Sequence, residues 1–250
     1  MSLFSIELMK SKYKEIHFES IDSTNTYLKH HYLSLDDLTI VSCDYQTNGK
    51  GRNDRVWKSD KGDNLLFSLL IKEGYLVAKG GYFSLVAAIS VLEAIEKNFK
   101  KLNVTIKWPN DVYVNDKKVC GILLEGQIPE FLVVGIGINI NQEEFIGDYR
   151  VTPTSLYLET GKKIDINSFK RDVFDILIDN VTNIDLKHHH FIRQFHTHNH
   201  LDNKVIKFLF NGEYLEGKVK GISDDFSLII DVNGEEKRIT SGEVSLFKFE

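Results

Sequence analysis

The segment 46–57, QTNGKGRNDRVW, has the residue types and spacing in this chain that are best suited to binding an anionic ligand. It contains two glycines and three cations (Lys50, Arg52 and Arg55), and Val56 is its only aliphatic side chain. Glycine lets backbone N–H groups approach a ligand closely, and cations at this spacing can surround an anion. Because it has so little apolar surface to bury, the segment is predicted to be an exposed, mobile loop. The alternative is a solvated turn with ordinary surface charge.

Two further motifs lie between residues 107 and 139. The sequence KWPND at 107–111 is followed by Lys118, although a lysine in a turn is usually solvated and Trp-Pro is also typical of a packed strand end. Gly135-Ile136-Gly137 lacks the third glycine and the following helix of a dinucleotide-binding motif. Its glycines therefore indicate that a ligand or a neighbouring part of the chain approaches this strand closely.

The composition is that of an ordinary globular protein, with 42% hydrophobic and 27% charged residues. The net charge of −5 provides no overall basic field for nucleic acid, so a phosphate ligand would have to be held by a local cluster. The longest apolar run, 131–140, is too short for a bilayer, and the N-terminus has no secretory pattern. Cys43 and Cys120 lie among apolar residues and are interpreted as buried thiols, which predicts a cytoplasmic location.

The elements that position these residues follow from hydrophobic periodicity. We predict strands at 16–21, 38–45, 64–72, 104–108, 112–114, 119–124 and 131–140, and helices at 26–32, 80–101, 168–180 and 186–195. The loop at 46–57 thus connects two core strands. The strands between 104 and 140 should be antiparallel, because their connections are too short for crossover helices, and their sheet should be covered on both faces. Asn167 is the predicted cap of the third helix.

From residue 204 onward, short strands alternate with turn signals such as Asn211-Gly212 and Asn233-Gly234, which predicts a small barrel of about 48 residues. We place the boundary near Leu201, which divides the chain into domains 1–201 and 202–250. The histidines between 188 and 200 have no cysteine or carboxylate at metal-ligand spacing, so we interpret them as a solvated helix face.

Taken in order, these motifs resemble those of a biotin protein ligase. The matching residues are Ser23-Thr24-Asn25, Gln46, Gly49-Lys50-Gly51-Arg52, Arg55 and Trp57, KWPNDVYVNDKKVCGILLE from Lys107, GIGIN from Gly135, and Ser241–Leu246 in the terminal barrel. The resemblance implies an α+β fold: a mixed, largely antiparallel sheet flanked by helices, similar to the core of class II aminoacyl-tRNA synthetases, followed by an SH3-like β-barrel. Each motif is weak alone, but their order and spacing together are specific.

The resemblance also implies an activity. Biotin and ATP, with Mg²⁺, would form biotinyl-5′-adenylate, and the biotinyl group would pass to a lysine of a biotin carboxyl carrier protein. The biotin-binding residues would be Ser23, Thr24, Asn25, Gln46, Gly49, Lys50, Gly51, Arg52, Lys118 and Gly121. The nucleotide-binding residues would be Arg52, Arg55, Trp57, Asn110, Lys118 and Asn139. Lys118, Arg52 and Asp111 would be catalytic, with Asp111 orienting a metal or the incoming lysine.

The sequence departs from the family pattern Gly-Arg-Gly-Arg-X-Gly-Arg at two positions. Lys50 stands at the first arginine, and Asp54 stands at the last glycine. Lysine lacks the planar fork of arginine, and aspartate forbids conformations that only glycine tolerates. Both departures leave the details of loop closure open.

Two other functions remain as alternatives. A lipoate–protein ligase shares this fold and chemistry, although the chain lacks that family's Arg-Arg-x-Ser-Gly-Gly-Gly type of motif. A non-catalytic biotin-binding module is the second alternative, and retention of Lys118, Arg52 and Arg55 argues against it. The lead at 1–15 is too brief for a helix-turn-helix domain, so a ligase without nucleic-acid or membrane partners is expected. The oligomeric state stays open, a homodimer included.

Overall fold

The computed structural model describes residues 13–53, 55–240 and 244–246, with side chains up to residue 240. The strands are β1 (Lys14–Phe18), β2 (Thr39–Cys43), β3 (Asn64–Ile71), β4 (Val104–Lys107), β5 (Asp111–Val114), β6 (Lys117–Gln127), β7 (Phe131–Asn139), β8 (Val205–Phe210), β9 (Glu213–Ile222), β10 (Leu228–Val232), β11 (Glu235–Ile239) and β12 (Val244–Leu246). The helices are α1 (Thr24–His31), the 3₁₀ turn η1 (Tyr32–Ser34), α2 (Gly74–Val77), α3 (Tyr82–Asn98), α4 (Leu156–Thr160), α5 (Ile166–Thr182) and α6 (His188–Thr197).

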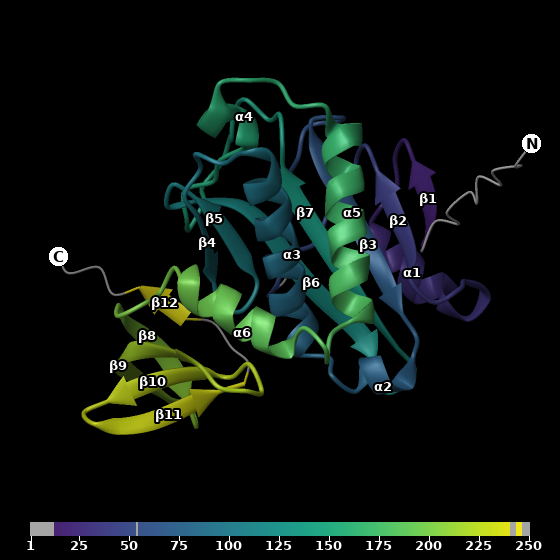
Figure 1. Cartoon of the computed structure of the whole chain (residues 1–250). Helices are drawn as coiled ribbons and strands as arrows, with labels where there is room; N and C mark the ends of the chain where they lie inside the picture. The colour runs from purple at the N-terminus through teal and green to yellow at the C-terminus, as the bar shows by residue number, and fades with distance from the viewer. Residues whose placement is uncertain (1–12, 54, 241–243, 247–250) are drawn as a thin grey trace, which may run out of the picture.

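A seven-stranded sheet forms the main body, in the order β1-β2-β3-β7-β6-β5-β4 (Figure 1). Every neighbouring pair is antiparallel except β1 and β2, which run parallel because α1 connects them as a crossover. The predicted mixed, largely antiparallel sheet is therefore confirmed. The predicted antiparallel pairing of the strands between 104 and 140 is confirmed as well.

Helices cover both faces of this sheet, as the apolar strands predicted. Figure 1 shows α3 and α5 side by side over one face, where Phe67 of β3 meets Phe174 of α5 with ring centroids 4.7 Å apart. On the other face, Leu28 of α1 packs with Val41, Leu70 and Val133 in a separate cluster. All eight residues of β3 are buried for this reason. In the described part of the chain, no helix combines the length and apolar character needed to cross a bilayer.

Two helix predictions are corrected by the structure. The helix expected at 80–101 as amphipathic is α3, and it buries all of its residues from Phe83 to Leu92 because α5 and α6 enclose the side that faces away from the sheet. The cap of α5 is Asp165 and not Asn167, since its carboxylate accepts the backbone N–H groups of Asn167 and Ser168. The short helices α2 and α4 were missed because one turn carries no periodicity.

The C-terminal strands form a five-stranded antiparallel sheet, ordered β11-β10-β9-β8-β12. Asn211, Gly212, Asn233 and Gly234 all have positive φ, as the predicted hairpin turns require. Residues 241–243 of the motif Ser241–Leu246 lie outside the described residues. The domain boundary near Leu201 remains a prediction.

The histidine-rich stretch 188–200 is only in part the solvated face that the sequence predicted, since His189 and His196 are exposed but the other histidines contact neighbouring elements. It forms α6, which lies between the large sheet and the small one (Figure 1), and its exit. His190 pairs with Glu93 of α3 at 2.5 Å, and His198 pairs with Glu96 at 3.1 Å. His200 is buried and stacks on Tyr113 of β5, with ring centroids 4.4 Å apart. His190, His198 and His200 thus pack against α3 and β5, because α6 lies between the large sheet and the small one.

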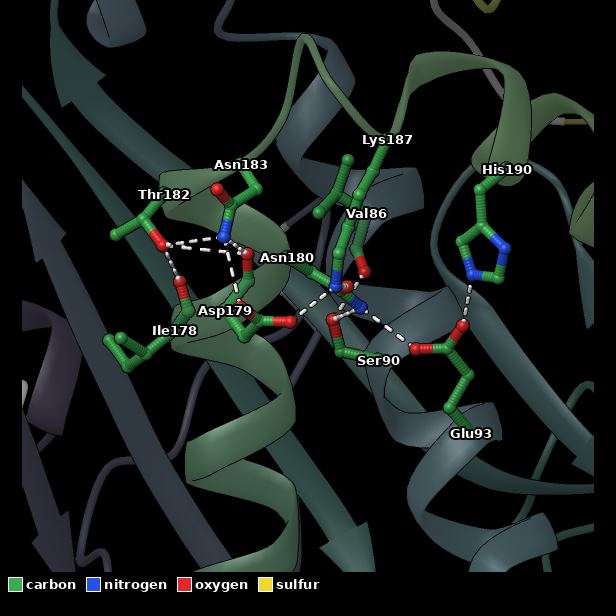
Figure 2. Close-up of polar contacts among 10 residues, drawn as sticks. All are labelled: Val86, Ser90, Glu93, Ile178, Asp179, Asn180, Thr182, Asn183, Lys187 and His190. Atoms are coloured by element: carbon green, nitrogen blue, oxygen red, sulfur yellow. Dashed lines mark hydrogen bonds and ion pairs between the residues drawn. The ribbon is translucent and has the colours of Figure 1, made fainter.

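A polar network holds α6 and α5 against α3, as Figure 2 shows. The Asn180 side-chain amide of α5 donates to Glu93 at 2.9 Å and to Ser90 at 3.0 Å, and Lys187 donates to the Asn180 side-chain oxygen Oδ1 at 2.7 Å. Because Asn180 and Ser90 are almost fully buried, each of these hydrogen bonds satisfies a group that would otherwise be costly to bury.

Candidate active site

A cavity of about 430 Å³ brings together residues from seven separate segments of the chain. Its lining includes all but one of the predicted site residues: Ser23, Thr24, Asn25, Gln46, Lys50, Gly51, Arg52, Arg55, Trp57, Asn110, Asp111, Lys118, Gly121 and Asn139. Gly49 is the exception. A Cβ at Gly49 would lie 2.5 Å from the Trp57 carbonyl oxygen, so this glycine permits the close packing of the loop on itself.

The cationic loop is anchored at its start and folded back on itself. The backbone N–H groups of Thr47 and Asn48 donate to the carbonyls of Ile21 and Asp22 at 2.9 Å, and Trp57 donates to Gly49 at 3.0 Å. Its start is thus tied to the residues that lead into α1, and its residues 50–52 and 55–57 line the cavity. Most of its side chains are exposed, as predicted, whereas its mobility remains a prediction. Asp54 lies outside the described residues.

Gly121 of β6 and Gly135 and Gly137 of β7 are explained by two side chains that lie against them. A Cβ at Gly135 would stand 2.2 Å from the Asn25 amide oxygen, and one at Gly137 would stand 2.6 Å from the Trp57 indole. A Cβ at Gly121 would also meet this indole, at 2.9 Å. The predicted close approach is confirmed, and the approaching groups are Asn25 and Trp57.

Basic side chains dominate the charge around the cavity. The cations of the lining are Lys50, Arg52, Arg55, Lys58, Lys107, Lys118 and Arg150, and its carboxylates are Asp111 and Asp148. Seven cations against two carboxylates make a local positive site in a chain whose net charge is −5. Such a site attracts phosphate and carboxylate groups at short range.

Lys118 lies at the centre of this charge. Its ammonium group is 2.7 Å from the Asp111 carboxylate and 5.8 Å from the centre of the Trp57 ring. Arg52 reaches across from the loop and donates to the Asn110 side-chain oxygen at 3.0 Å. The loop and the turn between β4 and β5 are therefore already in contact through the pair Arg52–Asn110.

Two buried polar atoms in the cavity lining need a partner. Within the described residues, the indole nitrogen of Trp57 and the side-chain oxygen of Asn139 are buried without a hydrogen bond. Buried polar groups are nearly always satisfied in folded proteins, so these two groups are suited to contact a bound ligand.

The sequence analysis missed the segment 145–153, which contributes Phe145, Gly147, Asp148, Tyr149, Arg150, Val151 and Pro153 to the lining. It is held beside β6 by two backbone bonds of 2.9 Å, from Lys118 N–H to Thr152 and from Thr154 N–H to the Lys118 carbonyl. The available signal was its position directly after the GIGIN strand, in a stretch without periodicity. The buried Lys107 was part of the KWPND motif but was given no role, and the buried Ser68 was missed because nothing in its local sequence distinguishes it.

Comparisons with known proteins agree with this geometry. Residues 17–141 match the Biotin/lipoate A/B protein ligase family, and residues 203–246 match the Biotin protein ligase C terminal domain. The chain is 33% identical over 222 residues to the Bifunctional ligase/repressor BirA of Bacillus subtilis, covering 83% of this chain and 66% of that protein, so it spans about two thirds of that relative's length. It is 31% identical over 109 residues to the Biotin--[acetyl-CoA-carboxylase] ligase of Mycobacterium tuberculosis, covering 42% of this chain and 41% of that protein.

A solved structure extends the match to the fold. The Biotin protein ligase from Aquifex aeolicus in complex with biotin and ATP superposes with a TM-score of 0.81 at 32% identity, over 94% of this chain and 99% of that one. The match covers 94% of this chain and therefore includes the C-terminal sheet as well as the large one. The chain belongs to the biotin/lipoate A/B protein ligase family and, with its C-terminal domain, to the biotin protein ligases.

Proposed function

We propose that this protein is an ATP-dependent biotin protein ligase. It joins biotin and ATP to biotinyl-5′-adenylate with release of pyrophosphate, and transfers the biotinyl group to a lysine of a biotin carboxyl carrier protein. The observation that carries the proposal is the lining of one cavity by the uncharged polar side chains of Ser23, Thr24 and Gln46 together with seven cations. Biotin has a neutral ureido head and a carboxylate tail, so it matches both kinds of lining.

The first step places two anionic groups together. A biotin carboxylate oxygen attacks the α-phosphorus of ATP, a C–O–P bond forms, and the bond to pyrophosphate breaks. At an effective dielectric near 20, a cation about 4 Å from an anion contributes roughly 4 kcal/mol before desolvation. Lys118 and Arg52 are the cations we assign to the carboxylate and the α-phosphate. Asp111 holds Lys118 at 2.7 Å before the substrates bind, which keeps the ammonium group in the cavity.

The second step is aminolysis of the mixed anhydride. The neutral amine of the acceptor lysine attacks the biotinyl carbonyl, an amide bond forms, and AMP leaves with the electron pair. We assign Asp111 to orient this amine, because it is a carboxylate in the lining next to Lys118. The loop at 46–57 excludes water from the anhydride when it closes over the cavity.

Mg²⁺ fits this site as an ion carried mainly by substrate phosphates. The described residues contain no group of three or more His, Cys, Asp or Glu side chains that could hold a metal. Mg²⁺ commonly takes one or two protein carboxylates and completes its shell with phosphates and water. Asp111 would hold the ion as the alternative to orienting the acceptor amine, and the ion would neutralise charge on the departing pyrophosphate.

A pyrophosphate-release assay tests the proposal. We expect release only when biotin and ATP are both present, followed by labelling of a purified biotin carboxyl carrier domain. Release with lipoate but not with biotin would favour the other branch of the family. Biotin binding without release would support a non-catalytic module. The two buried thiols are consistent with a cytoplasmic enzyme, which we also propose.

A further inference from the structure

A row of buried polar side chains runs from Thr24 at the start of α1, which lines the cavity, to Glu125 of β6. Thr24 Oγ1 lies 2.6 Å from Ser68 Oγ, Ser68 Oγ lies 2.5 Å from Asn25 Oδ1, and Asn25 Nδ2 lies 2.8 Å from Glu125. Lys29 of α1 pairs with the same carboxylate. Thr24, Ser68 and Asn25 are each at least 96% buried, so water does not compete for these hydrogen bonds.

Glu125, at the end of the row away from the cavity, determines which group donates in each hydrogen bond. Burial raises the pKa of Glu125, but the hydrogen bonds from Lys29 and Asn25 outweigh burial and the pKa lies below its usual value. Glu125 is therefore a carboxylate at neutral pH and can only accept. The Asn25 amide nitrogen must face it, and the same nitrogen also approaches the Leu123 carbonyl at 3.5 Å. The amide oxygen of Asn25 is left facing Ser68.

Each hydroxyl along the row has one proton, so the orientation of the Asn25 amide determines which group donates in every hydrogen bond up to the cavity. Ser68 donates its proton to the Asn25 oxygen. The short contact between Thr24 and Ser68 then needs the proton of Thr24, since two lone pairs would repel at 2.6 Å. Thr24 Oγ1 also lies within hydrogen-bond distance of the Gln46 side-chain oxygen, at 3.1 Å. That oxygen already accepts the Thr24 backbone N–H at 2.9 Å, and the contact with Ser68 is 0.5 Å shorter, so the single hydroxyl proton goes to Ser68. Thr24 Oγ1 therefore presents lone pairs to the cavity that it lines.

We propose that Ser68, Asn25 and Glu125 are positioning residues that hold the Thr24 hydroxyl as a hydrogen-bond acceptor for a ureido N–H of biotin. The proposal rests on the proposed function, and it changes the role of Asn25 from a direct ligand contact to one exerted through Ser68. The site then selects a ligand with an N–H at this position and disfavours one with an acceptor there, because two lone pairs would face each other.

Calorimetric titration of the full chain tests this selectivity. The probes are biotin and its two cyclic carbamate analogues, in which one ureido N–H is replaced by a ring oxygen. We expect one analogue to bind the wild type at least about tenfold more weakly than biotin. The measured quantity is the dissociation constant of this analogue divided by that of biotin. In Ser68→Ala this ratio should fall roughly three- to tenfold, because the Thr24 proton is free to turn toward the ring oxygen.

A second variant and a control separate positioning from packing. The double variant Lys29→Glu, Glu125→Lys keeps an ion pair but puts a hydrogen-bond donor beside Asn25. The Asn25 side-chain amide should then turn its oxygen toward this donor, and the ratio of the two dissociation constants should fall again. This variant tests the proposal even if Ser68→Ala does not fold. Ser42→Ala removes a buried serine of the neighbouring strand that contacts Glu15 and His17, and should leave the ratio unchanged.

Parallel losses of affinity for biotin and the analogue, with the ratio unchanged in every folded variant, would overturn the proposal. Failure of the wild type to bind biotin would instead overturn the proposed function, and the positioning role with it.

Discussion

Lys118 illustrates how much one side chain depends on its immediate neighbours. Its backbone is bonded on both sides to the segment 152–154, and its ammonium group lies between Asp111 and the Trp57 ring. Lys117, the adjacent residue, points elsewhere and pairs with Glu159 at 3.0 Å. Two neighbouring lysines therefore have different surroundings, and only the surroundings of Lys118 suit a reaction between anions.

Replacing Lys118 by alanine should lower the rate of adenylate formation by roughly a hundredfold or more, because a preorganised charge at the reacting groups is lost. Pyrophosphate release with biotin and ATP is the measurement. Lys117→Ala is the matched control and should retain nearly full activity. A similar rate in both variants would contradict the assignment of Lys118.

His200 provides a prediction about pH. Burial lowers its pKa to about 4, with Lys204 contributing in the same direction, whereas an unfolded histidine titrates near 6.5. Between these values the unfolded chain binds a proton that the folded chain does not, so stability falls as the pH falls from about 6.5 to about 4. His200→Gln should weaken this pH dependence.

Urea unfolding of wild type and His200→Gln at several pH values between 4 and 7 measures the difference. The exposed His189, changed to glutamine, is the control and should follow the wild type. Identical slopes for wild type and His200→Gln would show that another group carries the pH dependence.

At the scale of elements, the site depends on close packing between the loop and the sheet. The strands β6 and β7 carry glycine where the Trp57 indole and the Asn25 amide lie against them. The loop packs against the sheet because its Trp57 indole lies on the glycines of β6 and β7, where no side chain stands in its way. Trp57 in turn contacts Lys118, so the position of the loop and the position of the central cation are linked.

Gly137→Ala should displace the Trp57 indole, because the new Cβ would stand 2.6 Å from it. We expect a loss of unfolding free energy of about 1–3 kcal/mol and slower adenylate formation. Fluorescence of Trp57, measured in a Trp108→Phe background, reports the displacement. Gly74→Ala is the control, since nothing lies within 4 Å of its added Cβ. Unchanged fluorescence and activity in Gly137→Ala would contradict this packing.

At the scale of the whole molecule, the barrel is joined to the catalytic domain next to the active site. The indole N–H of Trp108 donates to the Phe226 carbonyl at 3.0 Å, and both residues are buried. His188 of α6 stacks on the Phe226 ring at 5.2 Å. Trp108 is followed by Pro109 and Asn110, which line the cavity, so the contact between the domains lies two residues from the partner of Arg52.

Trp108→Phe keeps most of the apolar volume but leaves the Phe226 carbonyl without its donor. An unsatisfied buried carbonyl should lower the unfolding free energy by about 1–3 kcal/mol, measured by urea denaturation. Tyr214→Phe on the exposed face of β9 is the control and should change it little. If both variants unfold at the same urea concentration as the wild type, this hydrogen bond does not stabilise the contact between Trp108 and the barrel.

The sequence by itself determined the elements and the order of the motifs. Hydrophobic periodicity identified the strands β3 and β7, the turn residues identified the hairpins of the barrel, and the composition of 46–57 identified an exposed cationic loop. These features depend on interactions between residues near one another in the chain. Local sequence therefore carries enough information to predict them.

Tertiary structure alone decided which distant residues complete the site. Ser68 stands beside Thr24, and Glu125 beside Asn25, because α1 packs across β3 and close to the far end of β6. The segment 145–153 reaches the cavity because Pro153 pairs with Lys118 at the beginning of β6. Such contacts follow from strand register and helix packing between residues up to 100 positions apart, and no local pattern specifies them.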